Sequence, residues 1–164
     1  MFSNKQRLAN LEALLEQDYE KLSYFQMELG DLSHAPSKFE LIRRIKREVL
    51  PTLHSHEVEY WNLLIQLSSQ CPISELEAQT TILDVLQEAG NIRQKQIPEE
   101  AFQLLQKIWD KLNEPGTAAS AKAKFAVNLI PGILAYEFEL DTENTLRQIF
   151  NPLKQLFRAA VKKF

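Results

Sequence analysis

The sequence contains few of the residues that several functional classes require. Its 164 residues include one cysteine, Cys71, and four glycines. A single cysteine cannot form an internal disulfide, so a fold held together by disulfides within the chain is excluded. The glycines are dispersed, and none can assemble the glycine-rich loop that holds nucleotide phosphates. No stretch approaches the ~20 consecutive apolar residues of a membrane-spanning helix.

An excess of positive charge is also missing. The chain has 19 Lys and Arg residues against 22 Asp and Glu residues, which gives a net charge of -3. Dedicated nucleic-acid-binding domains are strongly basic, so we expect no nucleic-acid partner. The N-terminus is amphipathic and charged where a secretory signal has an apolar run, which favours a cytoplasmic protein. A chain of this length buries roughly 70% of its unfolded surface, and we expect a single domain over residues 1–164.

A heptad pattern near the N-terminus predicts a long helix from Lys5 to Leu32. Asp18 interrupts its apolar seam, which argues against a long dimeric coiled coil. The segment Ser37-Lys-Phe-Glu40 fits a capping box and predicts the start of a second helix. This helix continues to residue 67, with a kink or break expected near Val49 because Pro51 cannot donate a backbone hydrogen bond. Together the two helices predict a coiled-coil-like antiparallel hairpin over residues 5–67.

The rest of the chain predicts further helices and one small β-hairpin. The segment Ser74-Glu-Leu-Glu77 is another capping box, and a helical pair is expected over residues 74–113. Residues 117–124 are small and polar, which indicates a flexible connection. Two β-prone runs then flank Pro131-Gly132, so residues 124–140 are expected to form a β-hairpin before an amphipathic C-terminal helix, in a region spanning 124–164. The predicted fold class is mainly α, a helical bundle built on the long hairpin.

Residues with catalytic or metal-binding chemistry are sparse. His54 and His56 lie two positions apart and point to different helix faces, whereas helical zinc sites use i and i+4 spacing. Cys71 stands in a short connector without a catalytic signature. We therefore expect no catalytic residue, metal site, cofactor or small-molecule substrate, and an enzyme built on these three side chains is the least favoured hypothesis.

Aromatic and basic side chains supply the candidates for an interaction surface. Aromatic rings dominate the energetics of cores and interfaces alike. The basic run from Arg43 to Arg47 can contact an acidic partner, although a solvated helix face is the favoured interpretation. The edge of the expected β-hairpin can add a strand from a partner. The candidate residues are Phe25, Arg43, Arg44, Arg47, Tyr60, Trp61, Tyr136 and Phe138.

These features predict a non-enzymatic protein-binding module that acts through a protein partner or self-association. The alternative hypothesis is a membrane-associating effector, because residues 141–164 carry five basic and two acidic residues whereas residues 1–140 carry 14 basic and 20 acidic ones. A basic amphipathic helix with Phe150, Phe157 and Phe164 on its apolar side can lie on an anionic membrane surface. A helix packed in the core has the same pattern, and it is the favoured interpretation.

Two passages resemble a known group of domains. Residues 11–64 are similar in layout to the helical hairpins of bacterial, especially cyanobacterial, effector-associated domains that precede STAND-type NTPases and other signalling modules. Residues 125–157 resemble a segment found with such hairpins, in which an apolar Ile-Pro run leads to an amphipathic helix. The resemblance implies an adaptor in bacterial signalling or defence, with no catalytic residues to carry over.

Overall fold

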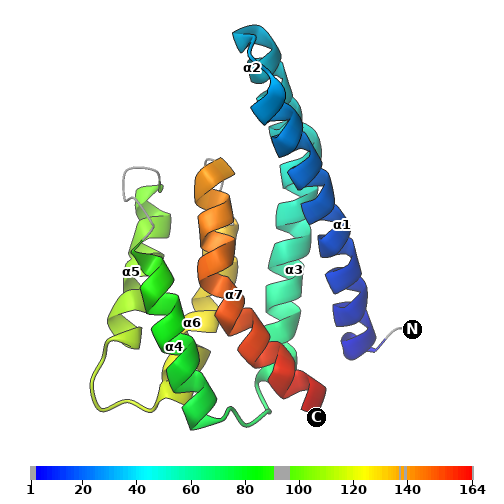
Figure 1. Cartoon of the computed structure of the whole chain (residues 1–164). Helices are drawn as coiled ribbons and strands as arrows, with labels where there is room; N and C mark the ends of the chain where they lie inside the picture. Colours follow the sequence, from blue (N-terminus) through cyan, green and yellow to red (C-terminus); the bar gives the residue numbers. More distant parts are fainter. Residues whose placement is uncertain (1–2, 91–96, 137, 139, 164) are drawn as a thin grey trace. The chain divides into compact units, whose positions relative to one another are not determined.

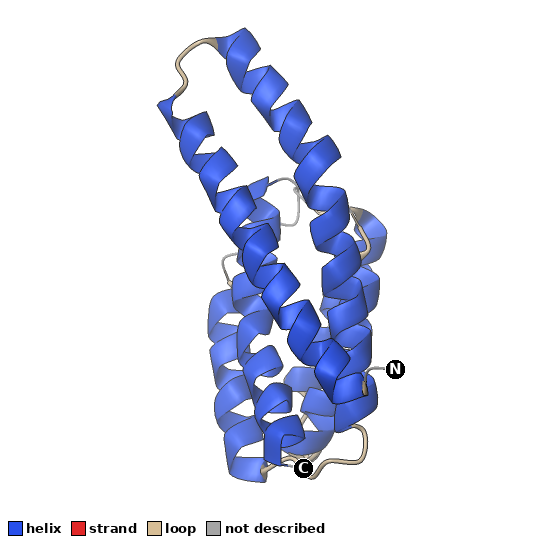
Figure 2. Cartoon of the chain, turned by 90° about the vertical axis from the view of Figure 1, so that its right-hand side faces the viewer, coloured by secondary structure: helices blue, strands red, loops and turns tan. Residues whose placement is uncertain are grey.

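The computed structural model describes residues 3–90, 97–136, 138 and 140–163, and all regular secondary structure in this part of the chain is helical (Figures 1 and 2). The all-helical fold confirms the mainly α prediction. The elements in chain order are α1 (Asn4–Asp31), α2 (Ala35–Arg44), the π-helix η1 (Ile45–Val49), α3 (Leu50–Ser68), α4 (Glu75–Ala89), α5 (Glu99–Leu112), α6 (Ala119–Leu134) and α7 (Leu140–Lys163).

The chain divides into two compact units, Met1–Tyr60 (unit 1) and Trp61–Phe164 (unit 2). The boundary falls within α3, so this helix contributes to both units. Each unit is described by itself. The expectation of a single domain over residues 1–164 stays a prediction.

In unit 1, the heptad pattern becomes the buried side of α1. Ser3 caps this helix, because its hydroxyl accepts a hydrogen bond from the backbone N–H of Gln6 at 3.1 Å. The helix packs against α2 and η1. Its buried residues are Leu8, Leu11, Leu15, Leu22 and Phe25, all at heptad-compatible spacing. The narrow apolar seam is therefore sufficient to define which side of α1 faces its neighbours.

The start of α2 differs from the predicted capping box. The helix begins at Ala35, with His34 at the N-cap and no side-chain cap, so Ser37 lies inside the first turn. Proline is favoured in the first turn of a helix, where its missing N–H has no intrahelical partner to lose. Pro36 therefore allows the helix to start earlier than expected, and Ser37 Oγ lies 3.2 Å from His34 Nδ1 instead of capping the helix.

The irregularity expected ahead of Pro51 takes the form of the π-helix η1. The backbone N–H of Leu50 donates to the carbonyl of Ile45, five residues earlier. A π turn inserts one extra residue into a helix and is a recognised cause of bending. Ile45 and Val49 remain buried, so the helix passes the proline without losing its apolar side.

In unit 2, α4 packs against α6 and α7, and α6 also packs against α5 (Figure 1). Ser74 caps α4 as predicted, because its Oγ accepts the N–H of Glu77 at 3.4 Å. The core is assembled from all four helices. Its fully covered side chains include Val85, Leu105, Ile108, Ile130, Ile133, Leu146, Ile149 and Leu153.

The predicted β-hairpin over residues 124–140 is wrong. Residues Ala119–Leu134 form α6, and Pro131 and Gly132 lie inside this helix rather than in a turn. The predicted flexible connection at 117–124 is also wrong, since α6 begins at Ala119. Small and β-branched side chains that recur every three or four residues form one buried side of the helix, and tertiary packing overrides their local β-propensity. Glu137 and Glu139 of the expected second strand lie outside the described residues.

Among the described residues, no helix is long and apolar enough to cross a membrane.

Candidate functional site

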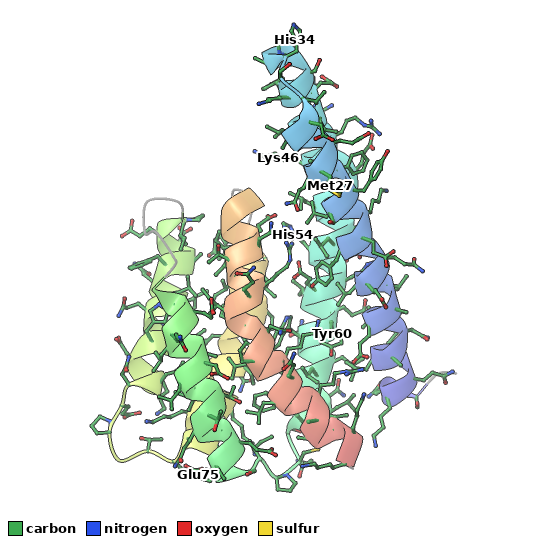
Figure 3. The ribbon with its side chains drawn as sticks, viewed as in Figure 1. Met27, His34, Lys46, His54, Tyr60 and Glu75 are labelled. Carbon is green, nitrogen blue, oxygen red and sulfur yellow. The ribbon has the colours of Figure 1, made fainter. Side chains whose placement is uncertain are left out.

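Polar side chains join α1 to α3 inside unit 1. His56 Nδ1 lies 2.6 Å from Asp18 Oδ2, and both side chains are largely covered, with exposed fractions of 21% and 17%. The hydroxyl of Tyr60, a residue labelled in Figure 3, donates to Glu12 Oε1 at 3.0 Å. Asp18 interrupts the apolar seam because it pairs with His56 across the two helices. His56 therefore has a local structural partner.

Two further carboxylates of α3 take part in the same set of contacts. Glu57, which is 2% exposed, accepts a hydrogen bond from the hydroxyl of Tyr19 at 3.2 Å. Arg7 forms a two-point ion pair with Glu59, at 2.8 and 3.0 Å. The hydrogen bonds from Arg7 hold the pKa of the Glu59 carboxyl below its ordinary value. These contacts fix the register of α1 on α3, and none of them forms a reactive cleft.

The candidate residues predicted from sequence separate into buried and exposed groups. Phe25, Tyr60 and Trp61 are buried, so these rings belong to the packed interior of the units that contain them. Arg43, Arg44 and Arg47 are exposed. The Arg44 guanidinium lies 5.2 Å from the centre of the Phe25 ring and 3.5 Å from Glu48.

The other two candidates do not lie on a strand. Tyr136 is half-buried just after α6, and Phe138 is buried. Because the segment that precedes them is helical, the expected strand edge for partner binding is absent from the described residues.

The largest exposed apolar side chains of unit 1 were not singled out by the sequence pattern. Tyr24, Met27 and Phe39 are 60%, 70% and 68% exposed. Tyr24 and Met27 belong to the last two turns of α1, and Phe39 belongs to α2; Met27 is labelled in Figure 3. Tyr24 and Met27 fall outside the heptad spacing of α1, whereas Phe39 lies three residues before Ile42 and matches the apolar spacing of its helix, so the sequence pattern gives no sign that it is exposed. Exposed apolar side chains in a group are typical of binding surfaces.

A shallow groove of about 530 Å³ lies between the end of α1 and α2, and its lining includes none of these three side chains. We call it the distal groove. Its apolar lining comes from Leu32 and Leu41, and its charged lining comes from Glu28, Asp31, Glu40 and Arg44. Of these lining residues, only Arg44 is among the candidates predicted from sequence.

Unit 2 contains Cys71, the single cysteine of the chain. Cys71 is buried, and its Sγ lies 3.4 Å from the carbonyl oxygen of Leu67. Among the described residues of the whole chain, no group of three or more His, Cys, Asp or Glu side chains is placed to hold a metal ion.

The apolar side of α7 is occupied by the core of unit 2. Phe150 and Phe157 are each 1% exposed, whereas Phe164 lies outside the described residues. A helix that binds a membrane surface needs its apolar side free. In the folded unit Phe150 and Phe157 are therefore not available for that role.

Comparison of the chain with protein-family models, with curated proteins and with solved structures finds no match.

Proposed function

We propose that the chain is a non-enzymatic protein-interaction module whose binding surface is the distal end of unit 1, formed by the end of α1 and by α2. The observation that carries the proposal is the exposure of Tyr24, Met27 and Phe39 on α1 and α2, the two helices between which the distal groove lies. Burying large apolar and aromatic side chains is the main source of binding energy at protein interfaces. The packed interior of unit 1 is complete without these three residues.

The buried contacts of unit 1 support a binding role over a chemical one. His56 and Asp18 pair with each other, and Glu57 accepts a hydrogen bond from Tyr19. These groups serve the packing of α1 on α3, which holds the distal end as a presented surface. The resemblance to effector-associated adaptor domains agrees with this proposal. The bacterial signalling or defence setting and the cytoplasmic location stay predictions.

A capture experiment tests the proposal. A tagged full-length chain and its Met27→Glu, Phe39→Glu double variant are compared by quantitative pull-down and by light scattering. The control is Leu83→Glu, because Leu83 has the same 68% exposure as Phe39 but lies on α4 in unit 2. We expect the wild-type chain and the control to retain a bound protein or a higher mass that the double variant loses, with unchanged helical circular dichroism in all three.

The proposed function would be contradicted if the wild-type chain is a strict monomer and captures no protein that the Met27→Glu, Phe39→Glu variant fails to capture.

A further inference from the structure

The distal groove combines an apolar lining with an excess of negative charge. Three carboxylates line it, Glu28, Asp31 and Glu40, against the single guanidinium of Arg44. Arg44 is already engaged inside unit 1, by Glu48 at 3.5 Å and by the Phe25 ring. Glu28 accepts a hydrogen bond from the hydroxyl of Tyr24. Because this hydroxyl is neutral, the hydrogen bond does not compensate the negative charge of the Glu28 carboxylate. The groove therefore presents a negative rim around apolar walls.

The apolar part of the groove is small and comes from both helices, because Leu41 is 7% exposed and Leu32 is half-buried. Leu32 follows the end of α1, and Leu41 lies on α2. Tyr24 extends this surface along α1, because it lies one turn before Glu28 on the same side of the helix and is 60% exposed. A groove between two helices with an apolar floor is the geometry that accepts the apolar side of an amphipathic helix.

We infer that the distal groove binds a cationic amphipathic segment of a partner protein. The apolar side chains of that segment contact Leu32 and Leu41, and its Lys or Arg side chains meet the carboxylates of the rim. Long basic side chains suit such a site, because their aliphatic stems cover apolar surface while their charged ends stay near the rim. This inference rests on the proposed function and names the chemistry of the partner for the same end of unit 1.

The negative charge of the groove also disfavours acidic and neutral segments of a partner protein. An acidic partner places like charges beside Asp31 and Glu40, which costs binding free energy and slows association. A neutral apolar segment loses the electrostatic steering that opposite charges provide. Positive charge on the partner is therefore the specificity element, and the apolar contacts supply the rest of the affinity.

Defined peptides test the inference directly. The probe is a helical peptide of about 14 residues, four turns, with Leu on one side and Lys on the other. Its matched counterpart carries Glu at every Lys position. Both peptides are labelled, and their binding to the full-length chain is measured by fluorescence anisotropy at low and at high salt. We expect binding of the Lys peptide that weakens at high salt, and much weaker binding of the Glu peptide.

Charge reversal at the rim supplies the decisive variant. Asp31→Lys together with Glu40→Lys is expected to raise the Kd of the Lys peptide roughly tenfold or more and to improve binding of the Glu peptide. The matched control is Glu16→Lys together with Glu20→Lys, an equal charge change on exposed positions of α1 outside the groove. The control is expected to change the Kd of the Lys peptide less than about threefold, because its altered charges act on the groove only at long range and are screened by salt.

Equal effects of the two double variants, or equal binding of the two peptides, would overturn the inference. Self-association of the full-length chain in light scattering that the Lys peptide reverses would also overturn it, because the occupant would then be a second copy. If the Met27→Glu, Phe39→Glu variant loses a captured protein while the peptides show no charge preference, the proposed function stands and only the chemistry assigned to the groove fails.

Discussion

Replacement of Gly132 by alanine is expected to change stability in opposite directions in the two conformations considered for residues 124–140, the helix α6 that the structure contains and the β-hairpin that the sequence predicted. In α6, Gly132 lies in the last turn of the helix, where glycine is less favourable than alanine by up to about 1 kcal/mol. A Cβ added there meets Leu104 Cδ1 at 3.5 Å, which is ordinary van der Waals contact. Gly132→Ala is therefore expected to raise the free energy of unfolding of unit 2 by up to about 1 kcal/mol.

The expected β-hairpin predicts the reverse sign. In a type II turn at Pro131-Gly132, the glycine occupies the position that requires a positive φ. An alanine forced into the left-handed region costs roughly 1–2 kcal/mol. Destabilisation by Gly132→Ala would thus refute the helical assignment of this segment.

Gly116 provides the internal control for this experiment. It has a φ of 80°, and no atom lies within 4 Å of an added Cβ, so the substitution tests backbone conformation alone. Gly116→Ala is expected to lower the free energy of unfolding by roughly 1–2 kcal/mol. Urea titrations followed by far-UV circular dichroism measure both variants. A shift of 1 kcal/mol corresponds to about 4–8 °C in the Tm of a unit of this size, so thermal melts provide a second measurement.

Three further predictions follow from buried and capping contacts. Tyr60→Phe removes the buried hydroxyl that donates to Glu12 and is expected to cost about 1 kcal/mol in urea titrations, whereas an unchanged midpoint would show that this contact is not formed. Glu75 accepts the first backbone N–H groups of α6, which lowers its pKa below the ordinary 4.5, so its stabilising effect is present above that pH and is lost as the pH falls through the lowered value. Glu75→Gln is therefore expected to flatten the dependence of stability on pH below about 4.5, and the same slope in both proteins would contradict this. Ile130→Ala, at a fully buried position, is expected to cost about 2–5 kcal/mol, against less than about 0.5 kcal/mol for Leu83→Ala on the exposed side of α4.

The sequence predicted those elements whose signals are local. The heptad leucines of α1 predict a helix that the structure places at Asn4–Asp31, and Ser74 caps α4 where its capping box indicated. Pro51 predicted a local irregularity, and the structure contains a π-helix immediately before it. In each case the deciding interaction lies within about one helical turn of the residue that signals it.

The start of α6 could not be predicted because its cap comes from a distant residue. Ala118 at the N-cap position has no side chain that can accept a hydrogen bond, so the local sequence gives no sign of a helix start. The carboxylate of Glu75, on α4, instead accepts the N–H groups of Ala119 and Ser120. A contact over 44 residues of sequence is invisible to any local pattern. The Pro-Gly pair then suggested a turn that tertiary packing does not form.

The packed interior also has a local sequence signal, whereas the proposed binding surface has none. Periodicity identifies the residues that a helix buries. Phe25, Tyr60 and Trp61 were candidates for an interaction surface because aromatic rings suit both cores and interfaces. All three are buried. Met27, which is exposed and available to a partner, breaks the apolar pattern of α1, whereas Phe39 is exposed although it lies three residues before Ile42 and matches the apolar spacing. Exposed apolar groups favour aggregation. Their exposure on the two helices that flank the acid-rimmed groove is therefore best explained by binding, and the loss of a captured protein on changing Met27 and Phe39 to glutamate is the result on which that explanation depends.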